Sequence, residues 1–103
     1  MSRIEMIRKM LAKDADDTFL IYSLGMELTA AGEFAQAAAQ FRRCIELDAD
    51  YLPAYTEAGK GLRSEGKLDE ARALFQAGVK LADRLGKPHD RDYLQQQLDS
   101  LPK

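Results

Sequence analysis

Apolar residues along this chain recur with the spacing of one face of an α-helix. One stripe of this kind is followed later by a second, the first made of Leu20, Ile21, Leu24 and Leu28 and the second of Tyr55, Ala58 and Leu62. Such stripes predict amphipathic helices that bury one side. Gly32 and Gly66 end the two stripes, at the position where a left-handed helix cap favours glycine.

Each of these glycines precedes another helical stripe. The two stripes consist of Phe34, Ala37, Ala38, Phe41, Cys44 and Ile45, and of Leu68, Ala71, Leu74, Phe75, Gly78 and Val79. Short turns between helices favour antiparallel neighbours, so the chain predicts two helical hairpins. Helix starts are also marked: Ser2 and Glu5 have capping-box spacing, Asp16 or Asp17 is a cap, and Pro88 opens a last helix.

The two hairpins are copies of one repeat with a period of 34 residues. The identical pairs are Gly25 and Gly59, Leu28 and Leu62, Gly32 and Gly66, Ala37 and Ala71, Ala39 and Ala73, Phe41 and Phe75, and Leu47 and Leu81. The same shift places Arg8 on Arg42, so the amino-terminal segment reads as a second helix without its first. The predicted organisation is a single domain with a half repeat at 1–17, repeats at 18–51 and 52–85, and a capping helix at 86–103.

This pattern resembles the tetratricopeptide repeat. The residues that carry the resemblance are Leu24, Gly25, Leu28, Gly32, Ala37 and Phe41, and again Ala58, Gly59, Leu62, Gly66, Ala71 and Phe75. Ile21 stands where the family usually has an aromatic residue, and Ala49 and Asp83 stand where it has proline. The resemblance implies an all-α fold of about six helices, in which antiparallel helix-turn-helix repeats stack as a short right-handed superhelix.

In this family the first helix of each repeat lines a concave face that binds peptides or partner segments. Carried over by position, the candidate groove residues are Phe19, Tyr22, Ser23, Met26, Thr56, Glu57, Lys60, Arg63 and Arg91. The first helix is apolar at this face and the second is basic, which favours a protein or peptide partner with an apolar anchor and an acidic group. The competing interpretation is that neighbouring helices cover the apolar residues and that the cations are a solvated surface.

One subclass of the family holds a partner's terminal carboxylate with two lysines, two asparagines and an arginine. The corresponding positions here are Tyr22, Met26, Glu57, Lys87 and Arg91. Only the last two match, and Glu57 would repel a carboxylate at short range. The resemblance therefore does not extend to this clamp.

Composition narrows the class of partner. The chain has 15 basic and 17 acidic residues and a net charge of -2, which gives no overall field for nucleic acid or an anionic membrane. Cys44 is the only cysteine, which excludes an internal disulfide and favours a reducing compartment. No apolar run reaches the roughly 18 residues of a membrane span, and nothing near Met1 resembles a secretory signal. A cytoplasmic protein is expected.

Catalytic and cofactor sites lack the residues they need. His89 is the single histidine and lies next to Pro88 at a predicted helix start, so neither a metal site nor a histidine-activated nucleophile is indicated. Cys44 lies on a packed helix face and is expected to be a buried, inert thiol. We expect a protein that is not an enzyme and binds no cofactor.

Three functions remain open. The first is a scaffold or adaptor that binds a partner segment in the concave groove. The second is a self-assembly module, in which a homodimer buries terminal residues such as Met1, Ile4 and Met6. The third, an accessory subunit of a larger complex, differs from the first only in its partner.

Overall fold

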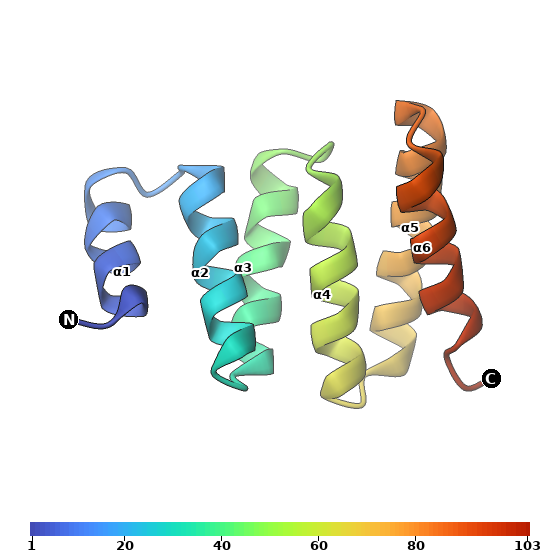
Figure 1. The fold of residues 1–103 in the computed structure, drawn as a ribbon, viewed down its shortest axis with the longest axis horizontal. Helices are drawn as coiled ribbons and strands as arrows, with labels where there is room; N and C mark the ends of the chain where they lie inside the picture. Colours follow the sequence, from blue (N-terminus) through green and yellow to red (C-terminus); the bar gives the residue numbers. More distant parts are fainter.

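A computed structural model describes residues 1–103 and contains six α-helices that succeed one another along the long axis of the molecule (Figure 1). The helices are α1 (Arg3–Lys13), α2 (Thr18–Ala30), α3 (Phe34–Leu47), α4 (Leu52–Ser64), α5 (Leu68–Leu85) and α6 (Pro88–Asp99). Each helix runs antiparallel to the next, and the molecule measures 41 × 28 × 19 Å. The predicted all-α stack of antiparallel helices, with about six of them, is confirmed.

The helix boundaries arise from capping residues that are recognisable in the sequence. Ser2 Oγ accepts a hydrogen bond from the Glu5 amide at 3.1 Å, and Asp17 Oδ1 accepts one from the Leu20 amide at 3.0 Å. Of the two predicted caps before α2, Asp17 is therefore the one used. Gly32 and Gly66 have φ values of 79° and 78°, so glycine ends α2 and α4 in the left-handed conformation that other residues rarely adopt.

Each hairpin is held by a glycine that faces a phenylalanine. A Cβ atom built on Gly25 would lie 2.5 Å from Cε1 of Phe41, and one on Gly59 would meet Phe75 in the same way. Both phenylalanine rings are fully buried. The missing side chain lets the two helices approach closely while the ring fills the space between them.

Two apolar cores follow from this packing, and α4 belongs to both. Ala54 and Ala58 of α4 join the core of α2 and α3, whereas Leu52 and Leu62 join the core of α5 and α6. Leu94 of α6 and Leu101, just after α6, complete the carboxyl-terminal core. Arg72 of α5 also donates a hydrogen bond to the Pro102 carbonyl. The middle helix thus connects the two halves of the stack.

The amino-terminal helix is the least buried element. None of the residues of α1 is buried, although Ile4, Ile7 and Leu11 pack in part against the first core. The opposite end differs, because α6 buries Leu94 completely. The stack is therefore closed at its carboxyl-terminal end and open at α1.

Polar contacts on the outer surface join helices that are distant in sequence. Arg42 of α3 binds Glu70 of α5 at 2.9 Å, and Arg43 binds Asp16 in the turn before α2 at 2.7 Å. The basic pair Arg42–Arg43 is thus occupied by carboxylates of the same chain.

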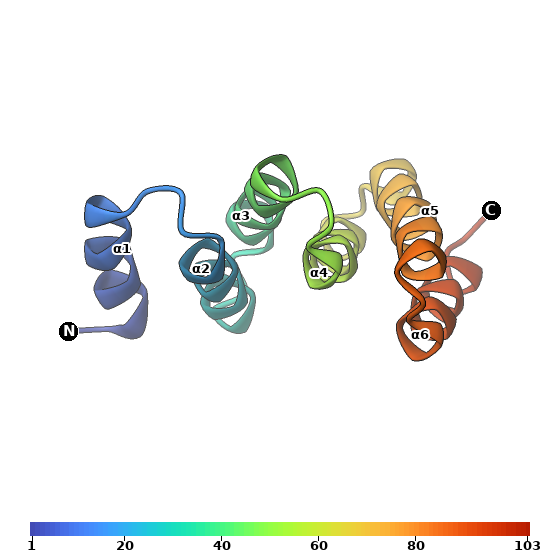
Figure 2. The same ribbon diagram turned by 90° about the horizontal axis from the view of Figure 1, so that it is seen from above.

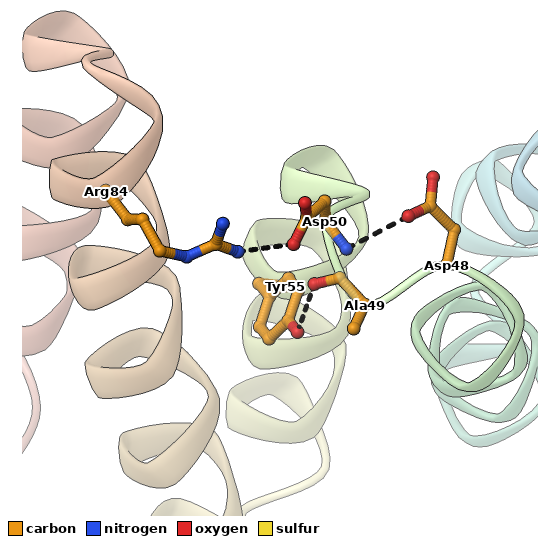
Figure 3. Close-up of polar contacts among 5 residues, drawn as sticks. All are labelled: Asp48, Ala49, Asp50, Tyr55 and Arg84. Atoms are coloured by element: carbon orange, nitrogen blue, oxygen red, sulfur yellow. Dashed lines mark hydrogen bonds and ion pairs between the residues drawn. The ribbon is translucent and has the colours of Figure 1, made fainter.

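The turn between α3 and α4 carries a denser set of contacts (Figure 3). The Tyr55 hydroxyl donates to the Ala49 carbonyl at 2.7 Å, and the Asp50 amide donates to Asp48 Oδ1 at 3.0 Å. Arg84, from α5, binds the Asp50 carboxylate. The start of α4 is thereby fastened both to its own turn and to the next helix.

None of the six helices combines the length and the apolar character required to cross a bilayer.

The close approach of α4 and α5 predicts a sharp difference between two glycines of α4. Gly59→Ala should lower the free energy of unfolding by about 1–3 kcal/mol, because the new methyl group overlaps the buried Phe75 ring. Urea unfolding followed by circular dichroism measures the change. In the matched control, Gly61→Ala, the nearest atom is 3.5 Å away, so alanine's better helix propensity should stabilise by up to about 1 kcal/mol. Equal effects of the two substitutions would contradict this account.

Candidate partner-binding face

The helices divide into two rows when the stack is seen from above (Figure 2). α3 and α5 lie along one side, and α2, α4 and α6 lie along the other. All the predicted groove residues lie on α2, α4 or α6, and therefore on the second row. Three hollows open between helices of the molecule on or beside this row.

The largest hollow lies between α4 and α6 and measures about 340 Å³. Its lining residues are Leu52, Pro53, Thr56, Glu57, Lys87, Asp90 and Tyr93. This α4–α6 hollow combines the apolar Leu52 and Pro53 with the Tyr93 ring, two carboxylates and one ammonium group. Such a surface suits a ligand that offers both apolar and polar contacts.

Glu57 lines this hollow, and Lys60 lies beside it, near two of its lining residues. Lys60 Nζ lies 3.6 Å from Glu57 Oε2 and 5.8 Å from the centre of the Tyr93 ring. The ammonium group is thus held between a carboxylate and an aromatic face, which orients it while its side chain stays partly accessible.

A smaller hollow of about 130 Å³ lies between α2 and α4, and Glu57, Lys60 and Arg63 border it. Arg63 is already engaged: it donates to Gln97 Oε1 of α6 and stands 5.9 Å from the centre of the Phe75 ring. Arg63 therefore ties α4 to α6, whereas Lys60 is the freer cation of the face.

Tyr22 connects the α2 and α4 sides of the row. Its ring centre lies 5.4 Å from those of Phe41 and Tyr51, in tilted arrangements. Burial, and then the nearby Glu57 carboxylate, raises the pKa of the Tyr22 hydroxyl to about 12. The competing interpretation applies in part here, since neighbouring aromatic rings cover much of this side chain.

The other apolar residues predicted for the groove do not gather with Tyr22. Phe19 is 69% exposed and, with Ser23, lines a hollow between α1 and α2. The Ser23 hydroxyl donates to the Phe19 carbonyl at 2.8 Å. Met26 is 40% exposed and lines none of the hollows. The predicted apolar half of the groove is thus distributed over two separate surfaces.

Arg91, also predicted for the groove, lies elsewhere on α6. Its Nε atom is 2.9 Å from Asp83 Oδ1 on α5, and it also binds Asp92. The reason is a shift in register. α4 begins at Leu52 and α6 at Pro88, so their starts are separated by the 34-residue period plus two residues. Tyr93 therefore takes the place facing α4 that the strict period gives to Arg91.

Five residues that line the α4–α6 hollow are not among the predicted groove residues: Leu52, Pro53, Lys87, Asp90 and Tyr93. The available signal was Pro88, which marks the first turn of α6 and hence its register. Counting from this proline rather than from the repeat brings Tyr93 to the groove side.

Two residues considered for chemistry lie away from this face. Cys44 is fully buried, its thiol directed at the Thr18 carbonyl, and burial raises its pKa to about 11. A thiol in that state is protonated at neutral pH and is a poor nucleophile. His89 is exposed at the start of α6.

Comparison with known proteins agrees with this geometry. The tetratricopeptide repeat matches residues 20–51. A TPR repeat-containing protein of Pseudomonas aeruginosa is 35% identical over 79 residues, which cover 77% of this chain and 75% of that protein. The chain belongs to the tetratricopeptide repeat family.

Solved structures support the same assignment for the tetratricopeptide stack. A Bordetella parapertussis protein, solved in solution, has a TM-score of 0.83 at 26% identity, with 96% of this chain and 86% of that chain covered. A tetratricopeptide repeat domain protein from Salinibacter ruber, solved in solution, has a TM-score of 0.74 at 28% identity, with coverages of 80% and 83%. Tetratricopeptide repeats are generally protein–protein interaction modules and are typically not catalytic.

The environment of Tyr22 predicts a loss of stability in alkali. The folded state holds the Tyr22 proton more tightly than the unfolded chain, so its contribution is complete below pH 10 and disappears as pH rises towards 12. Tyr22→Phe should reduce the fall in unfolding free energy between pH 9 and pH 11.5, measured by urea unfolding at each pH. At pH 7 the substitution should change stability little, because phenylalanine keeps the ring that packs on Phe41 and Tyr51. An unchanged alkaline fall would contradict the prediction.

Proposed function

We propose that this protein is a non-catalytic scaffold that binds a segment of a partner protein along the row formed by α2, α4 and α6. The observation that carries the proposal is the α4–α6 hollow, beside which Lys60 lies 5.8 Å from the centre of the exposed Tyr93 ring. An aromatic side chain and an ammonium group beside a hollow of mixed apolar and charged lining can contact a peptide that has an apolar anchor and an acidic group.

The charges of the hollow define the partner segment further. Lys60 and Lys87 favour a carboxylate, whereas Glu57 and Asp90 disfavour a run of them. The segment we propose therefore presents one apolar side chain to Tyr93 and a single acidic group to the lysines. Peptide amide groups would donate to the two carboxylates of the hollow.

Tyr22, Thr56 and Glu57 extend this surface towards α2 along the same row. We place the function in the cytoplasm, because the single thiol of Cys44 is suited to a reducing compartment. No cofactor, nucleic acid or membrane is part of the proposal.

The proposal is tested with a peptide selected on the wild-type protein from a random peptide library, its affinity measured by fluorescence anisotropy. Lys60→Glu and Tyr93→Ala should each weaken binding by at least about tenfold, which corresponds to loss of one charge-assisted or aromatic contact. Lys80→Glu, an equal charge change on the exposed surface of α5, should leave the affinity unchanged. If both hollow variants bind like the wild type, the function does not reside in this hollow.

Homodimerisation is the alternative function, and the exposed methionines at the α1 end favour it. Met1, Met6 and Met10 are all at least half exposed. Sedimentation velocity over a wide concentration range tests this alternative, since a concentration-independent monomer would exclude homodimerisation.

A further inference from the structure

The open end of the stack carries an apolar hollow of about 300 Å³ between α1 and α2. Met6 and Met10 of α1 and Phe19 of α2 line it, with exposed fractions of 50%, 53% and 69%. These are among the largest exposed apolar side chains of the protein, and they lie together. An apolar surface of this kind usually has an occupant.

The repeat indicates what that occupant is. Four of the residues that line this hollow are Arg3, Ile7, Met10 and Leu20. The residues 34 positions later in the chain are, in the same order, Ala37, Phe41, Cys44 and Ala54. Those four residues are 0% exposed.

The element that covers the corresponding residues is α2. The Phe41 ring lies against Gly25 and Tyr22, and the Cys44 thiol faces the Thr18 carbonyl. The surface formed by α3 and α4 is thus covered by α2, whereas the equivalent surface formed by α1 and α2 is covered by no helix of this chain.

We infer that the α1–α2 hollow is the seat of an amphipathic helix supplied by a different protein, which packs on α1 and α2 as α2 packs on α3 and α4. The side chains that α2 buries in its own seat are Ile21, Leu24 and Leu28. The incoming helix presents a similar aliphatic stripe, with positions three and seven residues apart.

The charges near the seat specify a second feature of the incoming helix. Asp16 lies two residues before the start of α2 and binds Arg43 of α3, the helix after α2. Lys9 occupies the position 34 residues before Arg43 and makes no ion pair. The incoming helix therefore carries an acidic residue just before its first turn, where the helix dipole also favours it.

A second copy of this chain is a poor occupant for electrostatic reasons. α1 carries four cations and only one carboxylate, so symmetric pairing of two α1 helices would bring like charges together. The terminal helix α6 is preceded by Gly86 and Lys87 in place of an acidic residue, and its Leu94 is already buried. Neither α1 nor α6 of a second copy therefore has the features expected of the incoming helix.

The probe is a synthetic peptide of residues 14–31, which contains α2 and the acidic turn before it. NMR titration into the full-length protein should give saturable shifts at Ile7, Met10 and Phe19. The double variant Met6→Glu/Met10→Glu, at two exposed positions, should weaken binding by at least about tenfold. Leu47→Glu, also at an exposed apolar position, should not change it.

A charge pair of variants tests the acidic feature. Lys9→Glu should weaken binding by about fivefold, because Lys9 lines a hollow that shares Met10 with the seat. Arg8→Glu, the same charge change at the preceding residue, should have little effect, because Arg8 lines neither hollow. Lys60→Glu should leave the peptide affinity unchanged, so the seat and the α4–α6 hollow fail or succeed independently.

Several results would overturn the inference. These are no saturable binding by the wild type, equal binding by the Met6→Glu/Met10→Glu variant, and shifts centred on α3 that show exchange with the resident α2. A wild-type dimer that Met6→Glu/Met10→Glu converts to a monomer would also overturn it, because a second copy would then be the occupant.

Discussion

The close contact between a glycine of one helix and a phenylalanine of the next sets the geometry on which the remaining structure depends. Gly25 with Phe41, and Gly59 with Phe75, bring two helix backbones near enough for a fully buried ring to span the gap. A larger residue at either glycine would separate the helices and empty the space around the ring. Because this contact recurs after 34 residues, the two hairpins have the same shape and stack in the same way.

The middle helix of the stack, α4, takes part in both apolar cores. α4 contributes alanines to the core before it and leucines to the core after it, which makes the stack continuous. Its remaining positions, including Glu57, Lys60 and Arg63, lie between the hollows on the α2 and α6 sides. A helix held on both sides is a rigid support, and rigid positioning reduces the entropy that binding would otherwise cost.

The ends of the stack differ because the cores end differently. The carboxyl-terminal core is closed by α6 and by Leu101, whereas α1 covers one side of α2 and leaves its own other side to solvent. The exposed surface therefore changes along the molecule, from apolar at α1 and α2 to mixed in charge at α4 and α6. Our two proposals rest on these two surfaces, and each is specified by the charges around it.

Several features of the protein could be predicted from the sequence alone, because they depend on contacts between residues close in the chain or on an exact period. The helical stripes, the caps at Ser2 and Asp17, and the left-handed Gly32 and Gly66 are local, and they were predicted correctly. The pairing of Gly25 with Phe41 also follows from the family pattern.

Only the tertiary structure decided which groove residues meet. α5 is four residues longer than α3, and the turn after α5 is two residues shorter than the turn after α3. α6 therefore starts two residues later than the 34-residue period gives, and Tyr93 replaces Arg91 at the face. Likewise, Phe19 turns to α1 and Tyr22 to Phe41 and Tyr51, because the direction of a side chain between two helices depends on the packing of both neighbours.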